Sequence, residues 1–292
     1  MYRSLLEAIR DAEASGMTLS QVALKLESED QGKSIDSIRA HFARALEVMR
    51  GAIGDGMKGD LRSASGLVGG DAAKLRTGPD GPLANTPFRD ILARALAVQE
   101  VNAAMGVIVA APTAGGAGTL PAVLTGLGKS HGLPDEKLID GLATAGLIGA
   151  VIAERASLSG AEGGCQAETG AGAAMAAGAA TEMLGGSPSQ VGHAVALTMQ
   201  GMLGLVCDPL GGLVELPCVY RNATGAAIAM AGIEMAMAGI TFAIPCDEVI
   251  DVMGEIGREM DVRYRETACG GLAATPTGRK LAKERLYQIR RS

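Results

Sequence analysis

Three of the five cysteines, Cys165, Cys207 and Cys218, each lie beside glycine, proline or a carboxylate. They are too widely spaced to form the CxxC pairs of a zinc ribbon, but cysteines at the ends of helices can still converge in a folded domain. Free N–H groups and the helix dipole at an N-terminus favour thiolates and an anionic cluster. These residues alone leave two interpretations open: the thiols bind a metal centre, or they are buried as small hydrophobic side chains.

The sequence around the cysteines predicts where those helix ends lie. An Ala-, Gly- and Met-rich stretch, residues 168–184, predicts a helix just after Cys165. Residues 187–190 form a capping box with proline at the first helical position, and their helix is expected to run to about Val206 before the Cys207-Asp208-Pro209 break. Another helix is expected from Pro217 to about residue 239. Cys165 and Cys218 are therefore predicted at helix N-termini and Cys207 at a C-terminus.

Two loops offer polar groups that could hold a small ligand. Residues 62–82 are rich in Gly and Ser and include Ser65 and Lys74, so hydroxyls, backbone N–H groups and a cation could together bind a carboxylate or zwitterion. An ordinary surface loop would have the same composition. Residues 112–115 predict a helix break whose backbone faces the active site, or else a plain connection between helices. The glycines that follow do not match a dinucleotide fingerprint, because Pro121 stands where its third glycine belongs.

The composition predicts a single, mainly α-helical domain rich in small residues. The chain of 292 residues is 48% hydrophobic and has 42 glycines, but only 2% of it is aromatic. Such a core must pack by close approach of helices. We expect a helical lead-in at residues 1–60, a cluster and substrate region with glycine-rich loops at 61–278, and a basic tail at 279–292.

Charge and cysteine content indicate a cytoplasmic enzyme. The net charge of −6 argues against general nucleic-acid binding. An odd number of cysteines argues against a secreted disulfide framework. The N-terminus is expected to be an amphipathic helix and not a signal peptide. The least polar stretch, residues 223–245, is mostly Ala and Gly and carries Glu234, so no membrane span is expected.

Long motifs in a fixed order resemble the iron–sulfur-dependent L-serine dehydratase family, and the match covers essentially the whole chain, as in a separate alpha subunit. The motifs are SGAEGGCQAE, GLVCDPLGGLVELPC, IPCDEVIDVMGEIG, GGLAATPTGR, SGLVGGDAAKL and EVNAAMGVIVAAPTAGGAGTLPAVL. In that family three cysteines hold a [4Fe–4S] cluster with one iron open. The resemblance implies that Cys165, Cys207 and Cys218 are those ligands.

The resemblance also implies a reaction and a partner. An open iron would act as a Lewis acid on the hydroxyl of L-serine, giving pyruvate and ammonia. Polar residues inside the matching motifs are expected to bind the substrate: Ser65, Lys74, Asn102, Thr113, Arg221 and Asn222. The general base is not identified. The family's Ser-Ser-His-Thr motif is missing here, so we expect a beta-type partner subunit to supply it.

Several alternatives remain at this stage. Cys269 is expected to be structural, whereas Cys246 could approach the cluster. The chain could be another iron–sulfur lyase, such as a cysteine desulfidase or threonine dehydratase, or a helical scaffold subunit without activity. A pyridoxal-phosphate dehydratase ranks last, because no convincing pair of Schiff-base lysine and phosphate loop is found.

Overall fold

The structure is a computed structural model that describes residues 2–79 and 81–289. Within these residues the chain is mainly helical and contains no β-strand, and the predicted single, mainly α-helical domain is confirmed. No helix in this described part is long and apolar enough to cross a membrane.

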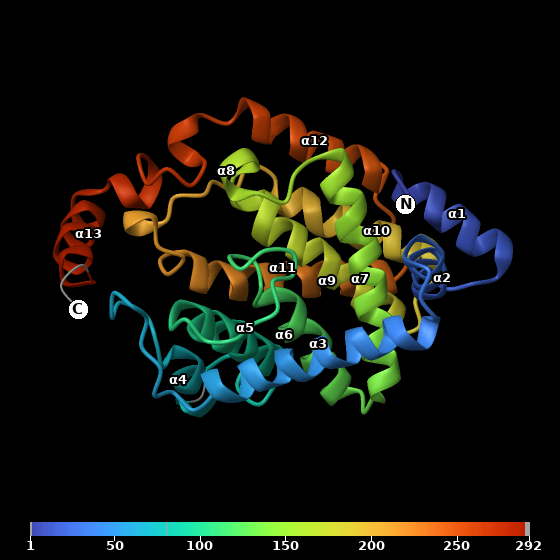
Figure 1. Ribbon diagram of the computed structural model, residues 1–292, viewed down its shortest axis with the longest axis horizontal. Helices are drawn as coiled ribbons and strands as arrows, with labels where there is room; N and C mark the ends of the chain where they lie inside the picture. Colours follow the sequence, from blue (N-terminus) through green and yellow to red (C-terminus); the bar gives the residue numbers. More distant parts are fainter. Residues whose placement is uncertain (1, 80, 290–292) are drawn as a thin grey trace.

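The predicted helical lead-in consists of three helices, which is confirmed. They are α1 (Leu5–Ser15), α2 (Leu19–Gln31) and α3 (Ile35–Gly56). Each begins after a hydroxyl residue, Ser4, Thr18 or Ser34, whose side chain accepts a hydrogen bond from a backbone N–H of the first turn. The long helix α3 runs along one edge of the molecule (Figure 1) and packs on α5 and α7.

The core surrounds one helix made of small residues, α9 (Ala171–Met183). Every residue of α9 except Glu182 is buried. It packs against α6 (Thr119–Ser130), α7 (Asp135–Arg155), α10 (Pro188–Met199) and α11 (Cys218–Met237). A Cβ atom at Gly178 would collide with Ile148, so glycine permits this close approach. Small side chains thus replace large rings as the means of filling the core, as the composition predicts.

A second hydrophobic cluster is formed mainly by residues of the N-terminal half of the chain. It joins the end of α3 to α4 (Asp71–Thr77) and α5 (Pro87–Ala103), and Val219 of α11 belongs to it as well. Thr86 caps α5 and Pro87 is its first residue, a position where proline is favoured. Because α11 contacts both clusters, its first turn is held between the two halves of the core.

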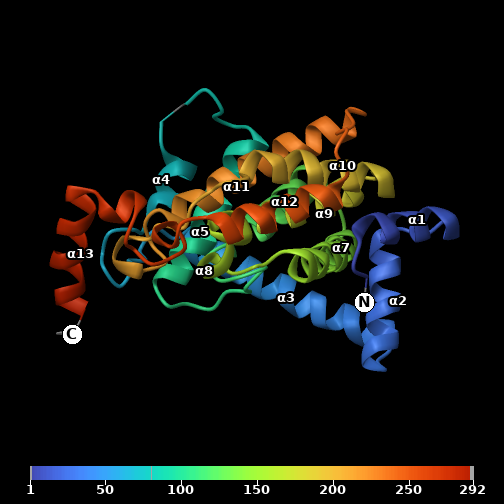
Figure 2. The same ribbon diagram turned by 90° about the horizontal axis from the view of Figure 1, so that it is seen from above.

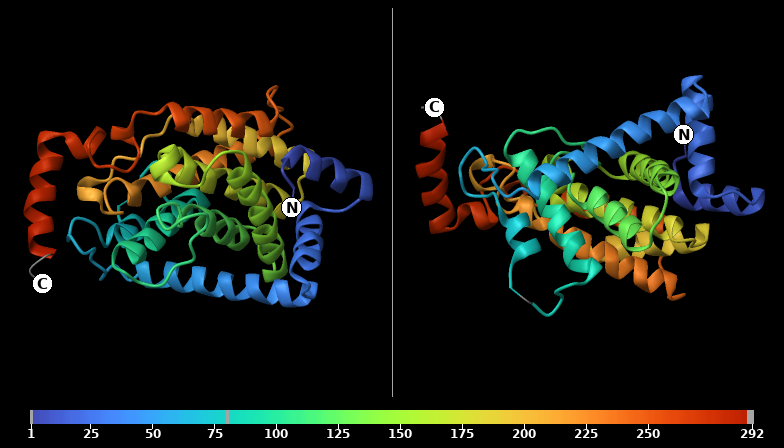
Figure 3. Two further views of the ribbon diagram at one scale, coloured as in Figure 1. Left: turned by 45° about the horizontal axis from the view of Figure 1, so that its top comes forward. Right: turned by 90° about the horizontal axis from the view of Figure 1, so that it is seen from below.

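The C-terminal part, here called the C-terminal rim, lies mostly on the side of the molecule opposite α3 (Figure 1). It comprises α12 (Cys246–Glu259), the 3₁₀ turns η4 (Val262–Tyr264) and η5 (Gly271–Ala274), and α13 (Pro276–Ile289). Helix α13 lies at the end of the molecule remote from α1 and α2 in all views (Figures 1–3). The predicted basic tail belongs to α13, and its last three residues, 290–292, lie outside the described residues.

The predicted extent of one helix was wrong. The capping box at Ser187 is confirmed, but α10 ends at Met199 and a 3₁₀ turn, η2 (Gln200–Met202), follows it. Gly204 then adopts φ +79°, which lies in the left-handed region that favours glycine. The chain leaves the helix axis there, so Cys207 lies in an extended segment and not at a helix C-terminus.

Candidate active site

The three cysteines occupy the ends of three different segments. Cys165 lies between the short helix α8 (Gly160–Gly163) and a π-helical turn, η1 (Gln166–Gly170), that leads into α9. Cys218 is the first residue of α11, after Pro217. The predicted positions of both at helix N-termini are therefore confirmed. A π-helical turn inside a helix often marks a functional site.

Cys207 is held by the C-terminal rim. Its N–H donates to the carbonyl of Tyr264 (2.7 Å), and its carbonyl accepts from the N–H of Glu266 (2.8 Å). These bonds form an isolated parallel bridge between Cys207 and Arg265. The loop after α12 therefore positions this thiol, whereas the sequence predicted that a helix end would do so.

The cysteines form a buried group of free thiols that influence one another. Cys165, Cys207 and Cys218 are 3%, 2% and 6% exposed, and none forms a disulfide. Burial, followed by the negative charges of Cys165 and Cys218, raises the pKa of the Cys207 thiol far above its ordinary value. Burial and Cys165 raise the pKa of Cys218 to about 12. Three thiolates here would repel each other without a compensating positive charge.

One cation lies beside this group. Arg221 of α11 has a side chain that is 16% exposed, and its charge opposes the rise in pKa of both Cys165 and Cys218. Its guanidinium lies 2.8 Å from the carboxylate of Asp208 and donates to the carbonyl of Val206 (2.8 Å). Asp208 also accepts from the N–H of Leu272 (2.6 Å). Arg221 therefore ties the Cys207 segment to the first turn of α11.

Glu168, in the π-helical turn, brings a carboxylate to the same place. It is half-buried, and one oxygen, Oε1, accepts a hydrogen bond from the Thr113 hydroxyl (2.6 Å). Burial raises the pKa of Glu168, the Thr113 bond opposes this, and the charge of Glu266 adds to it. Glu168 in turn raises the pKa of all three thiols, so its charge lies within reach of the whole group.

The loop between α5 and α6 carries Thr113 and is fixed by two asparagines. Asn222, fully buried, donates to the carbonyls of Gly115 (2.7 Å) and Cys218 (3.0 Å) and accepts from the N–H of Gly118 (2.9 Å). Asn102 donates to the carbonyl of Ala114 (3.1 Å). The predicted helix break at residues 112–115 is confirmed, and Thr113 within it contacts Glu168.

Ser65 donates hydrogen bonds to the carboxylate of Glu215, which lies three residues before Cys218. The Ser63 hydroxyl donates to Glu215 (2.7 Å), the Ser65 N–H does so at 3.1 Å, and the Ser65 hydroxyl makes a very short bond to the same carboxylate. All three residues are buried. The serine loop thereby braces the turn that precedes Cys218.

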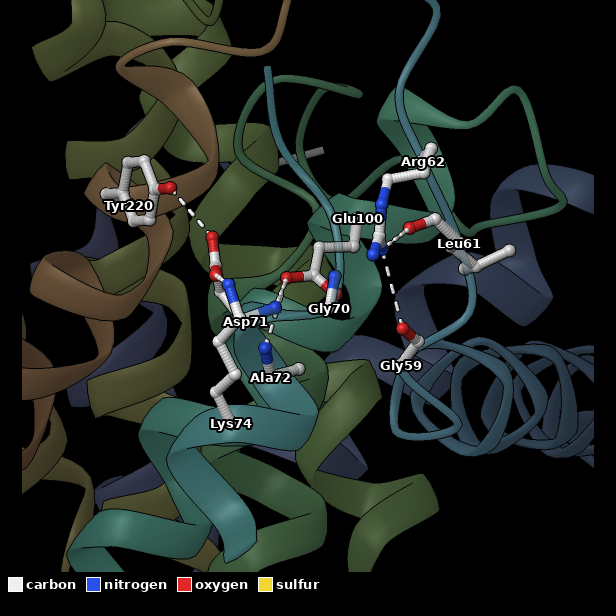
Figure 4. Close-up of polar contacts among 9 residues, drawn as sticks. All are labelled: Gly59, Leu61, Arg62, Gly70, Asp71, Ala72, Lys74, Glu100 and Tyr220. Carbon is white, nitrogen blue, oxygen red and sulfur yellow. Dashed lines mark hydrogen bonds and ion pairs between the residues drawn. The ribbon is translucent and has the colours of Figure 1, made fainter. Parts of the chain in front are cut away.

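Lys74 lies on α4, with its side chain exposed to solvent (Figure 4). Its ammonium pairs with Asp71 at 2.7 Å, and its side chain is 75% exposed. Burial raises the pKa of Asp71, but hydrogen bonds from Lys74 and Tyr220 outweigh this and bring the pKa below its ordinary value. The neighbouring N–H groups of Gly70, Asp71 and Ala72, which could have received a substrate carboxylate, donate to Glu100 instead (3.0, 2.6 and 3.1 Å).

The two other cysteines lie apart from this group. Cys246 begins α12 and belongs to the main hydrophobic core, where its sulfur packs near Gly192. Cys269 is exposed, and its thiol donates to the carbonyl of Thr267 (3.3 Å). The structure thus gives Cys246 a packing role.

Three carboxylates with clear roles in this region were missed in the sequence: Glu168, Asp208 and Glu215. Each lies within three residues of one of the grouped cysteines, and that spacing is the signal that could have identified them. The charge of each is placed by contacts with segments distant in the sequence, which spacing alone does not reveal.

The chain is similar to proteins of one family. A family model described as "Serine dehydratase alpha chain" matches residues 14–273. The chain is similar to a probable L-serine dehydratase alpha chain of Bacillus subtilis, with 48% identity over 97% of this chain and 95% of that one. It is also similar to an L-serine dehydratase alpha chain of Peptoniphilus asaccharolyticus, with 37% identity over 99% of both. An L-serine dehydratase of Escherichia coli is 38% identical over 93% of this chain and 61% of its own length.

Proposed function

Because the chain belongs to the serine dehydratase alpha-chain family, we propose that it catalyses the dehydration and deamination of L-serine to pyruvate and ammonia. We further propose that Cys165, Cys207 and Cys218 hold a [4Fe–4S] cluster for this reaction. The observation that carries the proposal is the group of three buried, free thiols from three segments, placed with Glu168 and Arg221.

The residues present fit a cluster. Iron–sulfur clusters are held by cysteine thiolates, and three cysteines leave one iron of four without a protein thiolate. In the described part of the chain no group of three His, Cys, Asp or Glu could hold a single metal ion. A four-iron cluster is larger than one ion, so its ligands need not meet at one point. The mutual repulsion of the thiolates is also the charge problem that iron would relieve.

A bound cluster would supply a Lewis acid for the departing hydroxyl of serine. The chain's own residues would do the rest. Arg221 offsets the negative charge of the thiolates, and Asn222 holds the 115–118 loop against the turn at Cys218. Thr113 lies in this loop and Asn102 contacts it, and both are proposed to hold the amino acid in register.

Ser65 and Lys74 are proposed to contribute less directly. Ser65 bonds to Glu215, three residues before Cys218, and so would position the ligand segment. Lys74 pairs with Asp71, which Tyr220 of α11 also contacts. Both therefore connect to the first turn of α11 through a carboxylate.

The reaction is an elimination. A base removes the α-proton, the C–O bond breaks, and hydroxide leaves as water with a proton from the site. The aminoacrylate product tautomerises to an imine, which water hydrolyses to pyruvate and ammonia.

We propose that the base comes from a beta-type partner. His41 and His131 are exposed, and His193 accepts a hydrogen bond from Phe242 (3.3 Å), so none is shown beside the cysteines. The Escherichia coli relative is longer than the region that it shares with this chain, and we propose that the partner corresponds to the rest of that protein.

The test is to purify the chain anaerobically and to measure iron, acid-labile sulfide and the visible spectrum before and after air. About four irons per chain are expected, with bleaching in air and loss of iron in Cys165→Ala, Cys207→Ala and Cys218→Ala. Cys269→Ala is the matched control, because it removes an exposed thiol. Serine deamination is then assayed with and without the beta-type partner, against threonine and cysteine as substrates. A folded chain that stays colourless after cluster reconstitution would favour a scaffold role.

A further inference from the structure

We infer that Glu168 binds the ammonium group of the amino-acid substrate and so selects amino acids over hydroxy acids that lack it. This inference rests on the proposed function, and it assigns a residue that would touch the substrate.

Glu168 has fewer hydrogen-bond partners than the fully buried carboxylates in the described part of the chain. The buried or half-buried carboxylates Glu100, Asp208, Glu215 and Asp247 each have at least two donors or an arginine. Glu182, half-buried on the adjacent helix α9, has the Ser20 N–H (3.1 Å) and the Thr144 hydroxyl (3.0 Å). Within the described residues Glu168 has only Thr113, and it takes part in no ion pair.

Two glycines pack closely against this carboxylate. A Cβ atom at Gly115 would lie 3.0 Å from both carboxylate oxygens of Glu168. A Cβ atom at Gly160 would lie 2.7 Å from Oε2 and 3.2 Å from the Cys207 sulfur. Gly160 therefore marks a point that is next to both the second oxygen of Glu168 and the thiol group. Any side chain there would press on the carboxylate and on the Cys207 sulfur.

The charge of this space suits a cation. Thr113 fixes Oε1 and leaves Oε2 without a donor among the described residues, and the nearby Glu266 adds negative charge. A half-buried carboxylate in this setting is stabilised by a donor that also carries positive charge. The substrate brings one, because L-serine is a zwitterion whose ammonium has three N–H donors. Its carboxylate and hydroxyl would then extend toward the cysteines and away from Glu168.

A purely structural role makes a different prediction. If Glu168 only accepts the Thr113 hydrogen bond, its replacement by glutamine keeps that acceptor and affects all ligands alike. If it binds the ammonium, glutamine removes the charge that distinguishes amino acids from their deaminated analogues. Two ligands separate these cases: L-alanine, which has the ammonium but no hydroxyl, and 3-hydroxypropanoate, which has the hydroxyl but no ammonium.

The experiment uses the cluster-loaded chain with its beta-type partner. Dissociation constants for L-alanine and 3-hydroxypropanoate are measured by calorimetry for wild type, Glu168→Gln and Glu168→Asp, with iron content as the check on integrity. Glu162→Gln is the matched control, since Glu162 is an exposed carboxylate of the same segment, bonded to Ser157 (2.6 Å). KM and kcat for L-serine are recorded in parallel.

Glu168→Gln is expected to weaken L-alanine binding about tenfold or more, the value of one hydrogen bond to a charged group. Binding of 3-hydroxypropanoate should stay the same or tighten, because a repulsive charge is removed. KM for L-serine should rise more than kcat falls, and Glu168→Asp should restore part of the L-alanine affinity. The control should match wild type.

Equal weakening of both ligands, or unchanged affinity for L-alanine, would overturn the assignment of Glu168. If Glu168→Gln loses iron, the ratio of the two constants in Glu168→Asp decides the matter. A wild-type complex without iron and without serine deamination would instead overturn the proposed function. The two failures are therefore distinct.

Discussion

Glu100 and Glu168 show how differently two parts of this molecule treat a carboxylate. Glu100, on α5, is 1% exposed and accepts from three backbone N–H groups at the start of α4. Glu168, beside the cysteines, is half-buried and has one hydroxyl donor in the described part of the chain. Burial raises the pKa of both. Glu100 thus receives three hydrogen bonds from the protein, whereas Glu168 receives one from the described residues.

This difference separates polar residues that hold the fold from those that leave room for a ligand. The α4–α5 region is closed: Glu100 and Glu215 receive a full set of donors from the loop at residues 63–72. The cysteine region is open: its cysteines raise one another's pKa, and among the described residues Glu168 has no ion-pair partner. Because buried polar groups are normally satisfied, the open set indicates where substrate and cofactor would complete the protein.

The closed region should respond to mutation through stability. Glu100→Ala leaves three backbone N–H groups without their acceptor and should lower the free energy of unfolding by about 3 kcal/mol. Glu100→Gln keeps an acceptor oxygen and should cost less. Urea unfolding of the wild-type and variant chains measures this. Glu168→Gln is the comparison and should cost below about 1 kcal/mol, since it removes no donor–acceptor pair. Equal losses at the two sites would abolish the distinction between closed and open regions.

The open region should respond through activity. Gly160→Ala places a methyl group against Glu168 and the Cys207 sulfur, and should lower kcat/KM for L-serine about a hundredfold, as small misplacements in active sites do. Gly141→Ala is the matched control: its Cβ meets its nearest neighbour at 3.6 Å, an ordinary contact. Steady-state assays of both variants, with iron content measured, test this expected difference in kcat/KM. Wild-type activity in Gly160→Ala would show that this space is not used by the substrate.

Much of the fold could be predicted because local rules determine it. The capping box at Ser187, the proline at the start of α5 and the alanine-rich stretch of α9 each specify a helix without help from elsewhere. The end of α10 could not be predicted. It depends on Gly204 and on the bridge between Cys207 and Arg265, which join segments far apart in the sequence.

The candidate site was predicted less completely for the same reason. The grouping of Cys165, Cys207 and Cys218 was expected from motifs, whereas Glu168 was passed over inside an alanine-rich stretch. Its importance comes from the Thr113 hydroxyl and from two glycines that arrive from other segments. Sequence reasoning finds the residue types, and tertiary contacts decide which of them lack partners.

Cys246 extends the comparison to thiols, because it is buried outside the cysteine group. Burial raises its pKa to about 12 from 9.0, so the native chain keeps its proton where the unfolded chain loses it. Between these values the unfolded state binds fewer protons, and stability falls as pH rises by about 1.4 kcal/mol per pH unit for this group. The contribution is fully present below pH 9. Unfolding measured between pH 9 and 10.5 should show a slope shallower by that amount in Cys246→Ala. Cys269→Ala, which removes an exposed thiol, should keep the wild-type slope, and an identical slope in all three chains would contradict the burial argument.

Tyr220 links the two regions and should give the smallest effect. Its hydroxyl, two residues after Cys218, donates to Asp71 at the start of α4 (2.8 Å) (Figure 4). Burial and this bond raise the pKa of Tyr220 to about 12. Tyr220→Phe should cost about 0.5–1 kcal/mol, because the hydrogen bond is partly exposed to water. A double-mutant cycle with Asp71→Asn should return a coupling of similar size, and ultraviolet titration should lose one of the two tyrosines, Tyr2 and Tyr220, whose pKa is raised to about 12. Since Tyr220 contacts Asp71 of α4, in the closed region, KM for L-serine should not change. A raised KM with unaltered stability would place Tyr220 with the open region and move the boundary between the two.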